Sequence, residues 1–397
     1  MPGLATKEHC TGCTACASVC PNNCISMISD QDGFFFPEIN KNICVECGLC
    51  EKICPIKTPV ESFKEDTNPK AFAAYSKNLD VRLNSSSGGI FSEIAKDVLK
   101  QDGAVFGAAY DENFKVVHIC IENETELSKL RGAKYAQSEL NNTFKNVKFR
   151  LDNNQLVLFS GTPCQIGGLI AFLQRDYNNL LCVDFVCLSV PSPMVWFEYI
   201  KYRAAEDFSG NLPKSINLRS KKSGWSRYSY SNCIEYTDDI NYSIRSGESL
   251  YMKLFGGGYI SRKSCENCNF KGYNRISDIT IGDFWGIWDI APEMDDNKGT
   301  SVVLVQSEKG KKIFNSISDR LIIKNVTLEE SSRQNRAMIS TIRTNPKREE
   351  ALELIRSGKI KNCQQWFNND TQNMQHINIM RFLKNSVKRI YSLFSKE

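Results

Sequence analysis

Residues 9–21, HCTGCTACASVCP, place four cysteines in one short loop that ends on a proline. The same spacing, C-x2-C-x2-C-x3-C-P, returns at residues 44–55 in CVECGLCEKICP. Three thiolates at every third residue fit three corners of a cubane 4Fe-4S cluster, and the cysteine before the proline reaches across to a second cluster. The two loops therefore predict two 4Fe-4S clusters that exchange their fourth ligands.

The exchange assigns every ligand in the two loops. One cluster is expected on Cys10, Cys13, Cys16 and Cys54, and the other on Cys44, Cys47, Cys50 and Cys20. Zinc is the alternative, but zinc ribbons use two C-x-x-C pairs a dozen or more residues apart, and a third cysteine at this spacing has no tetrahedral use. Cys24 lies just outside the first loop and is expected to be a small buried apolar residue.

The segment between the loops predicts two strands joined at Asp32-Gly33, the second running from Phe34 to Ile39. With its two loops this region resembles bacterial-type two-cluster ferredoxins, so we expect a ferredoxin domain over residues 1–57. We expect the first loop to lie at the outer end of an electron path whose chemistry takes place further along the chain.

Composition narrows the class of protein. The 397 residues suggest roughly two or three domains. Seventeen cysteines in so long a chain exclude a small secreted disulfide scaffold, and the first residues lack the apolar core of a signal peptide, so a reducing, cytoplasmic location is expected. No apolar run is long enough to span a membrane. The net charge of +5 is offset by clusters that carry about −2 each with their thiolates, which disfavours nucleic-acid binding.

A second domain is expected after a polar linker at residues 58–69. A strand is predicted at Lys70–Tyr75, and apolar residues at helical spacing predict a helix near residues 90–99. The helix follows residues 85–89, SSSGG, whose N-H groups and hydroxyls suit a phosphate, although serines also begin helices for purely structural reasons. A hairpin is predicted over residues 104–121. The following Arg131 and Lys134 indicate either a solvated basic turn or an anion clamp.

Two nearly continuous apolar runs, at residues 156–159 and 180–186, predict strands that are covered on both faces. Cys164 and Cys187 follow these strands, at the sheet edge where ligands collect. A C-x-x-C pair, Cys265 and Cys268, comes before two further predicted strands. Four cysteines are the number that one more 4Fe-4S cluster requires, and zinc held by the same four is the alternative.

Over residues 70–330 the motifs SSSGG, RGAKYAQS, SGTPCQ, VCLSVPSP, LRSKKSGW and SCENCNF resemble, in this order, the family of coenzyme F-420 hydrogenase and dehydrogenase beta subunits. Members bind FAD and a 4Fe-4S cluster. The resemblance implies FAD phosphates near Ser86, Ser87, Gly88 and Gly89, a flavin lined by Arg131, Lys134, Tyr135, Gln137, Ser138, Gly161 and Thr162, and a third cluster on Cys164, Cys187, Cys265 and Cys268.

The expected function is that of an iron-sulfur flavoprotein oxidoreductase, which passes electrons between 4Fe-4S clusters and a small organic acceptor or donor through FAD. F-420 is one candidate for that molecule, and a redox partner protein is expected at the clusters. Proton delivery is assigned to Asp283, Lys221 or Tyr135, because none of the three histidines is a convincing acid. The alternative is a non-enzymatic electron-transfer subunit of a larger redox complex.

The predicted fold joins a small ferredoxin-like two-cluster domain to a larger mixed α/β flavin-binding domain, with a helical region over residues 331–397. Near the C-terminus, residues 379–397 are amphipathic, with apolar residues on one face and basic residues on the other. Such a segment suits an anionic membrane surface. Docking on the protein itself or on a partner subunit is favoured over the membrane.

Overall fold

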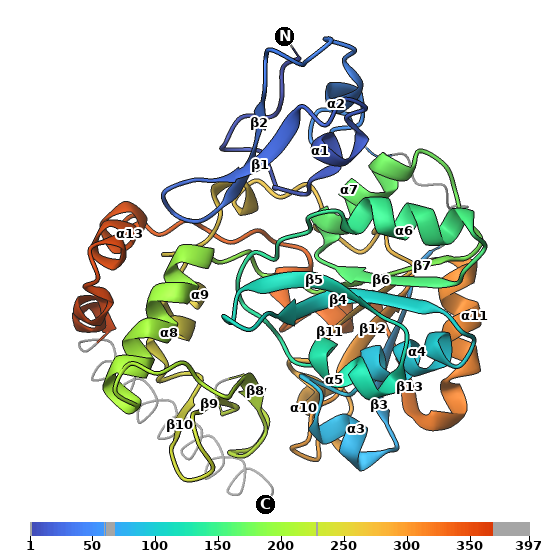
Figure 1. The fold of residues 1–397 in the computed structure, drawn as a ribbon. Coiled ribbons are helices and arrows are strands. Elements are labelled where there is room, and N and C mark those ends of the chain that lie inside the picture. Colours follow the sequence, from blue (N-terminus) through green and yellow to red (C-terminus); the bar gives the residue numbers. More distant parts are fainter. Residues whose placement is uncertain (1, 59, 61–67, 228, 368–397) are drawn as a thin grey trace, which may run out of the picture.

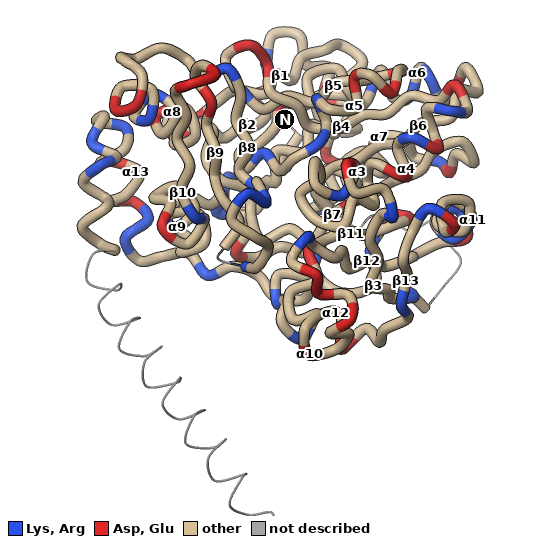
Figure 2. Tube along the Cα trace, turned by 90° about the horizontal axis from the view of Figure 1, so that it is seen from below, with Lys and Arg blue, Asp and Glu red and all other residues tan. Residues whose placement is uncertain are grey.

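The computed structural model describes residues 2–58, 60, 68–227 and 229–367 (Figure 1). Most of the predicted linker and the whole amphipathic segment at 379–397 lie outside the described residues. No helix in the described ranges is long and apolar enough to cross a bilayer. Figure 2 shows basic and acidic residues interspersed over the face that it presents.

The predicted ferredoxin domain projects from the rest of the molecule (Figure 1). Its strands β1 (Ile25–Ser29) and β2 (Phe35–Ile39) pair antiparallel, which confirms the predicted hairpin. The turn depends on Gly33, whose φ of 83° favours glycine. Each loop contains one short helix, which begins two residues after the second cysteine of its motif. These helices are α1 (Ala15–Val19) and α2 (Leu49–Lys52).

An eight-stranded mixed sheet with the order β13-β3-β12-β11-β7-β6-β4-β5 forms the centre of the larger part. Strands β11, β7, β6 and β4 are parallel to one another, and the remaining strands pair antiparallel with their neighbours. The strands are β3 (Lys70–Ser76), β4 (Ala104–Tyr110), β5 (Val116–Ile121), β6 (Val157–Gly161), β7 (Leu180–Phe185), β11 (Ile279–Asp283), β12 (Ser301–Val305) and β13 (Leu321–Val326). This arrangement confirms the predicted mixed α/β class.

Helices cover both faces of this sheet. One face packs against α4 (Ile90–Leu99), α5 (Leu127–Leu130) and α11 (Glu308–Ser316). The other packs against α6 (Thr143–Asp152) and α7 (Pro163–Leu173), and near β3 and β12 against α10 (Ile287–Ile290). The remaining short helices at the rim are α3 (Leu79–Leu83) and α12 (Leu328–Ser332).

A separate lobe with its own core stands beside the sheet (Figure 1). It consists of a three-stranded antiparallel sheet and three helices around buried aromatic residues such as Trp196 and Tyr251. Its elements are α8 (Pro193–Asp207), β8 (Ser215–Ser220), β9 (Ser231–Glu235), β10 (Asn241–Arg245), α9 (Leu250–Gly256) and α13 (Arg348–Arg356). The sequence analysis did not predict this lobe.

The first cysteine loop faces inward, against the larger part of the molecule. Cys13 and Ala15 belong to the same apolar core as α6 and α7, and a Cβ placed on Gly168 of α7 would come within 2.7 Å of the Cys13 Cβ. The tip of the β1-β2 hairpin is held as well, because buried Asp32 pairs with Arg356 of α13. The expectation that the first loop is the outer end was therefore wrong. The second loop, with exposed Cys47, takes that place.

Candidate functional site

Each of the two predicted ferredoxin sets surrounds its own small hollow. One hollow is lined by Cys10, Cys13, Cys16 and Cys54. The other is lined by Cys20, Cys44, Cys47 and Cys50, together with Cys24. In both, the fourth cysteine comes from the opposite loop, as the exchange of ligands requires.

Cys24 is in direct contact with Cys20, one of the four predicted ligands of the second set. It is 5% exposed, its Sγ lies 3.2 Å from Cys20 Sγ, and its backbone N-H donates to that sulfur at 3.3 Å. An N-H donated to a cysteine sulfur stabilises the thiolate form that binds iron. Cys24 therefore supports Cys20 through its backbone.

The four remaining predicted ligands also come together. Cys164 lies in the first turn of α7, Cys187 follows β7, and Cys265 and Cys268 lie in the segment that begins with the 3-10 turn Lys263–Cys265. Burial raises the pKa of the Cys164 thiol well above its usual range, and the neighbouring Cys187, Cys268 and Cys265 raise it further. Among the described residues no group of three or more His, Cys, Asp or Glu is arranged to hold a single metal ion.

The start of α7 positions Cys164. Thr162 and Gln165 form a reciprocal capping box, and Pro163 occupies the first helical position, so the helix begins directly at the carboxyl end of β6. The Thr162 hydroxyl lies 3.1 Å from Cys164 Sγ. At the other side of the set, the Val190 N-H donates to Cys265 Sγ at 3.4 Å.

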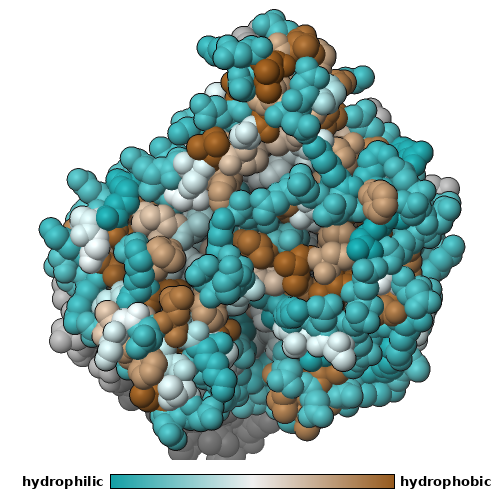
Figure 3. All heavy atoms as spheres, viewed as in Figure 1, coloured by the Kyte–Doolittle hydropathy of each residue, from teal (hydrophilic) through white to brown (hydrophobic). Residues whose placement is uncertain are grey.

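A cavity of about 900 Å³ adjoins these cysteines where the large sheet, the second lobe and the first cysteine loop meet. Thr11 and Gly12 of the first loop line it, as do Cys164 and Cys187. Its volume is near the upper end of the roughly 300–1,000 Å³ usual for small-molecule and cofactor sites. Figure 3 shows hydrophobic side chains gathered in the central hollow between the lobes.

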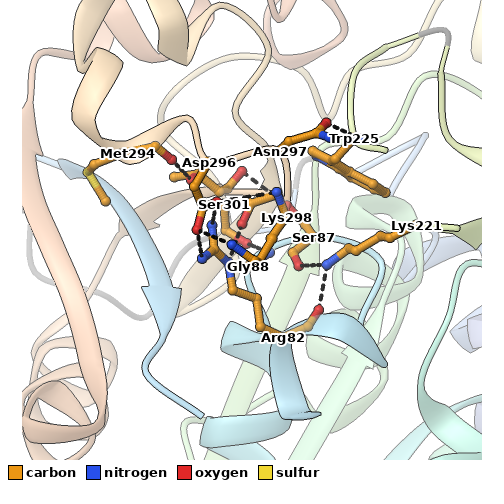
Figure 4. Close-up of polar contacts among 12 residues, drawn as sticks. Arg82, Ser87, Gly88, Lys221, Trp225, Met294, Asp296, Asn297, Lys298 and Ser301 are labelled. Atoms are coloured by element: carbon orange, nitrogen blue, oxygen red, sulfur yellow. Dashed lines mark hydrogen bonds and ion pairs between the residues drawn. The ribbon is translucent and has the colours of Figure 1, made fainter. Parts of the chain in front are cut away.

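Four of the five residues of the SSSGG turn at 85–89 line the cavity. Ser85, Ser86, Ser87 and Gly89 line it, and α4 begins there without a side-chain cap, which leaves first-turn N-H groups for a ligand. Gly88 instead faces the sheet, because its N-H donates to Ser301 Oγ at 2.9 Å (Figure 4). The Gly88 N-H group is therefore not free to bind a phosphate, and the place of Gly88 near the phosphates stays an untested prediction.

Lys221 does not join the other predicted proton donors. Its ammonium donates to the carbonyl oxygens of Arg82 and of Ser87, at 2.6 Å for the latter, and it is not among the residues that line the cavity (Figure 4). Burial lowers the pKa of Lys221 to about 7. Lys221 therefore holds the SSSGG turn in place through hydrogen bonds. Its role as a proton donor stays an untested prediction.

Arg131, Lys134 and Tyr135 all line the cavity. Arg131 donates to Ser92 Oγ of α4 at 3.1 Å, which joins the basic turn to the start of the helix. Lys134 is half-buried and donates to the carbonyl oxygen of Arg131 at 2.7 Å, and desolvation lowers the pKa of its ammonium to about 7. Both basic residues therefore line the cavity, Gly132 between them is exposed, and the anion clamp stays a prediction.

Gln137 and Ser138 lie in the cavity wall next to the ferredoxin domain. The Gln137 amide oxygen accepts the Phe35 N-H of β2 at 3.2 Å, so this residue also joins the two parts of the molecule. Ser138 Oγ lies 2.9 Å from His118 Nδ1, and His118 Nε2 lies 3.1 Å from the Ser160 carbonyl. Since a carbonyl only accepts, Nε2 carries the hydrogen and the Ser138 hydroxyl donates to Nδ1. The two other predicted residues of this wall, Gly161 and Thr162, line the cavity too.

A buried arginine that the sequence analysis missed connects two predicted residues. Arg219, 6% exposed, pairs with Asp283 at 2.5 Å and donates to the Tyr135 hydroxyl at 3.1 Å. Burial opposes its charge, but Asp283 and Tyr135 outweigh burial and raise the pKa of Arg219. Its guanidinium also lies 4.2 Å from the ring centre of Tyr230. Among the sequence signals, only its place in the motif LRSKKSGW pointed to Arg219.

Three buried polar atoms of residues that line the cavity have no hydrogen-bond partner within the described chain. They are Thr11 Oγ1, Arg219 Nε and Ser246 Oγ. Such orphans are rare in folded proteins and point to a ligand that satisfies them. The described lining also carries one carboxylate, Asp283, against six basic side chains: Arg131, Lys134, Arg219, Arg227, Lys253 and Arg336. The cavity therefore suits an anionic ligand with polar groups.

Comparison with known families agrees with this geometry. Residues 71–145 match the N-terminal part, and residues 154–331 the C-terminal part, of the family described as "Coenzyme F420 hydrogenase/dehydrogenase, beta subunit". The chain belongs to this family. Residues 9–58 match a 4Fe-4S dicluster domain, which confirms the ferredoxin-like domain with its two clusters.

Relatives with assigned names fall in the same group of redox proteins. One subunit of the F(420)H(2) dehydrogenase of Methanosarcina mazei is 23% identical over 333 residues, which cover 80% of this chain and 84% of the relative. The coenzyme F420-dependent sulfite reductase of Methanocaldococcus jannaschii is 29% identical over 332 residues. That match covers 81% of the present chain but only 47% of the reductase.

A solved structure is similar over much of the chain. A chain of the F420-reducing NiFe hydrogenase complex from Methanosarcina barkeri aligns with 79% of this protein and 94% of itself, with 14% identity and a TM-score of 0.44.

Proposed function

We propose that this protein is an iron-sulfur flavoprotein oxidoreductase, which exchanges electrons between a partner protein at the ferredoxin domain and a small organic molecule in the cavity. One observation carries the proposal. A single cavity is lined by the inner cysteine loop, by Cys164 and Cys187, and by the start of α4. Iron-sulfur centres, a phosphate seat and a site for an organic ligand therefore share one space.

The residues around the cavity fit FAD. The start of α4 and Arg131 would hold its phosphates, and Lys134, Tyr135 and Ser138 would line the ring, while Thr11 Oγ1 and Arg219 Nε gain partners. Bound FAD supplies the exchange between two-electron hydride chemistry and one-electron carriers. With Cys164, Cys187, Cys265 and Cys268 we assign the third 4Fe-4S cluster to the wall of the same cavity.

Tyr135 is the proposed proton donor to the organic molecule. Burial raises the pKa of its hydroxyl, so Tyr135 keeps its proton at neutral pH. Its oxygen accepts from Arg219, which leaves the hydroxyl hydrogen free to donate into the cavity. Asp283 holds Arg219 in place through their ion pair and so positions Tyr135 indirectly. We assign Asp283 and Arg219 as positioning residues.

The substrate and the partner follow from chemistry and from the relatives. The names of the relatives make F-420 the first substrate to test. The partner is assigned to the outer end of the ferredoxin domain, where Ile43, Val45 and Leu49 are exposed beside Cys47. Figure 3 shows hydrophobic side chains on the surface of the projecting part. Relatives that are subunits of larger complexes support such a partner.

Cofactor content of anaerobically purified protein tests the proposal. We expect about twelve irons per chain, from three 4Fe-4S clusters, and one FAD released by acid. Protein with about twelve irons and no flavin would be an electron-transfer subunit without its own substrate chemistry. A count of about eight irons would refute the third cluster. Variant Arg131→Gln, which removes a cation from the proposed phosphate seat, is expected to lower flavin content and leave the iron count unchanged.

A further inference from the structure

Arg262 occupies an unusual position between the two halves of the molecule. It is 2% exposed and stands three residues before Cys265 in the chain. Its backbone N-H donates to the Val190 carbonyl at 2.9 Å, which fixes it next to the four-cysteine set. The side chain extends in the opposite direction, toward the ferredoxin domain.

Three atoms of the guanidinium hold that domain. Nε donates to the Cys10 carbonyl at 2.8 Å, and one terminal nitrogen donates to the Phe35 carbonyl at 3.0 Å. The other terminal nitrogen donates to the Gln137 amide oxygen at 2.9 Å. The Phe36 ring centre lies 4.1 Å from the guanidinium carbon. Arg262 therefore connects the inner cysteine loop, β2 and the cavity wall.

The charge of Arg262 has no carboxylate partner within the described residues, because all of its acceptors are neutral oxygens. A buried arginine without a counter-ion is strongly unfavourable, since desolvation is not repaid by an opposite charge. Hydrogen bonds join Arg262 to a ligand of each set. Its Nε donates to the carbonyl of Cys10, and its own carbonyl accepts the Cys265 N-H at 3.1 Å. Thiolates of both sets can therefore supply the balancing negative charge.

We propose that Arg262 is a shared positive charge between the inner ferredoxin cluster and the four-cysteine centre, and that it raises the reduction potential of both. The inference rests on the third cluster of the proposed function. An electron added to either centre increases its negative charge, and a fixed cation at its edge stabilises that reduced form. Because one side chain acts on both centres, their potentials move together.

The test is a redox titration of the holoprotein, followed by EPR spectroscopy, on Arg262→Met. We expect the reduction equilibrium of both inner centres to shift at least about tenfold toward the oxidised form, which is 59 mV for a one-electron couple. The outer cluster of Cys44, Cys47 and Cys50 should keep its potential. Arg262→Lys keeps the charge but loses donors, so it should weaken the docking of the ferredoxin domain with little change in potential.

Two matched variants separate charge from packing. The Lys271 ammonium donates to the Cys187 carbonyl, and its hydrogen bonds within the described residues do not reach the inner loop, so Lys271→Met should shift the potential of the four-cysteine centre alone. Arg348 is a buried arginine at the same domain boundary, paired with Glu349 at 2.6 Å and within 3.9 Å of Asp32. Arg348→Met should lower stability and leave all three potentials unchanged.

The outcomes distinguish this inference from the function on which it rests. Absence of a four-cysteine cluster in the wild-type spectrum would contradict the proposed function itself. A wild-type protein with three clusters whose inner potentials do not respond to Arg262→Met would overturn the shared-charge inference alone. Equal shifts in Arg262→Met and Arg262→Lys would also overturn it, because they would assign the effect to lost hydrogen bonds.

Discussion

The two cysteine loops have the same motif and the same backbone, yet they stand in opposite surroundings. Gly12 and Thr14 in the first loop adopt φ of 69° and 65°, and Glu46 and Gly48 at the matching positions of the second adopt 54° and 74°. The first loop packs on α7 and lines the cavity, whereas Val45 in the second is 64% exposed. The motif specifies that a cluster is bound, and the surrounding structure specifies which cluster meets the cavity.

The difference in burial between the two loops suggests which loop faces a partner protein and which faces the cavity. Electrons exchanged with a partner are expected at the exposed loop, and the buried loop is expected to connect to the chemistry. Gly168, Gln137 and Arg262 approach the first loop from the larger part, and nothing lies within 4 Å of a Cβ placed on Gly48. The repeat is thus symmetric in sequence and asymmetric in function.

Removal of a crossing ligand should have the largest effect. Cys54→Ala is expected to destroy the inner cluster and Cys20→Ala the outer one, each with the loss of about four irons, because each residue lines the hollow of the opposite loop. Iron analysis and EPR spectra of both variants measure this. Cys363→Ala, at a buried cysteine of the second lobe, is the control and should keep all its iron. Loss of each variant's own-loop cluster would contradict the exchange.

A pair of glycine variants compares the docking of the two loops. Both Gly12→Ala and Gly48→Ala place a side chain at positive φ, which costs about 1–2 kcal/mol. Only the Cβ at position 12 also meets other atoms, among them the Phe35 carbonyl at 2.9 Å, so overpacking should add about 1–3 kcal/mol there. Chemical denaturation measures both free energies. Equal losses would show that the first loop is not tightly docked.

The cavity side should also carry a dependence on pH that the outer side lacks. Burial lowers the pKa of His118 to about 4, below its usual 6.5, so the unfolded chain binds a proton that the native protein excludes between these values. Stability should therefore fall as pH is lowered through this range, by about 2 kcal/mol from pH 7 to 5. Thermal unfolding across this range should show a flatter profile for His118→Gln. His9→Gln, at an exposed histidine, should keep the wild-type slope.

The smallest effect on stability is expected at the outer surface. Val45→Ser should change the free energy of unfolding by less than about 0.5 kcal/mol, because the side chain is mostly exposed. Iron content should stay at the wild-type value while electron exchange with the partner protein slows. A melting temperature and an iron assay measure the first two results. A large loss of stability would show that Val45 is covered, and the outer end would then need another location.

Local patterns carried much of this account. The spacing of the cysteines, the alternation around Asp32-Gly33 and the helical period after SSSGG each depend on neighbours in the chain, and the structure confirms the hairpin, β3, α4 and the β4-β5 pair. Apolar runs likewise predicted β6 and β7, and so placed Cys164 and Cys187 at the carboxyl ends of two neighbouring parallel strands.

Other features depend on partners that are distant in sequence. Arg219 looks solvated beside Lys222, and only its contacts with Asp283 and Tyr135 make it a buried site residue. The position of Arg262 between the two parts of the molecule is defined by its hydrogen bond to the Cys10 carbonyl, and no local sequence pattern connects these two residues. The same limit explains the error about the first loop, since identical motifs do not reveal which of them the rest of the chain covers.

The central claim is that the cluster of the first loop, and not that of the second, neighbours the four-cysteine centre at the cavity. Pulsed EPR spectroscopy of the reduced holoprotein measures the magnetic coupling between these centres. We predict that the four-cysteine centre stays coupled to a neighbour in Cys20→Ala, which lacks the outer cluster, and becomes isolated in Cys54→Ala, which lacks the inner one. Coupling that survives in Cys54→Ala and disappears in Cys20→Ala would contradict the account.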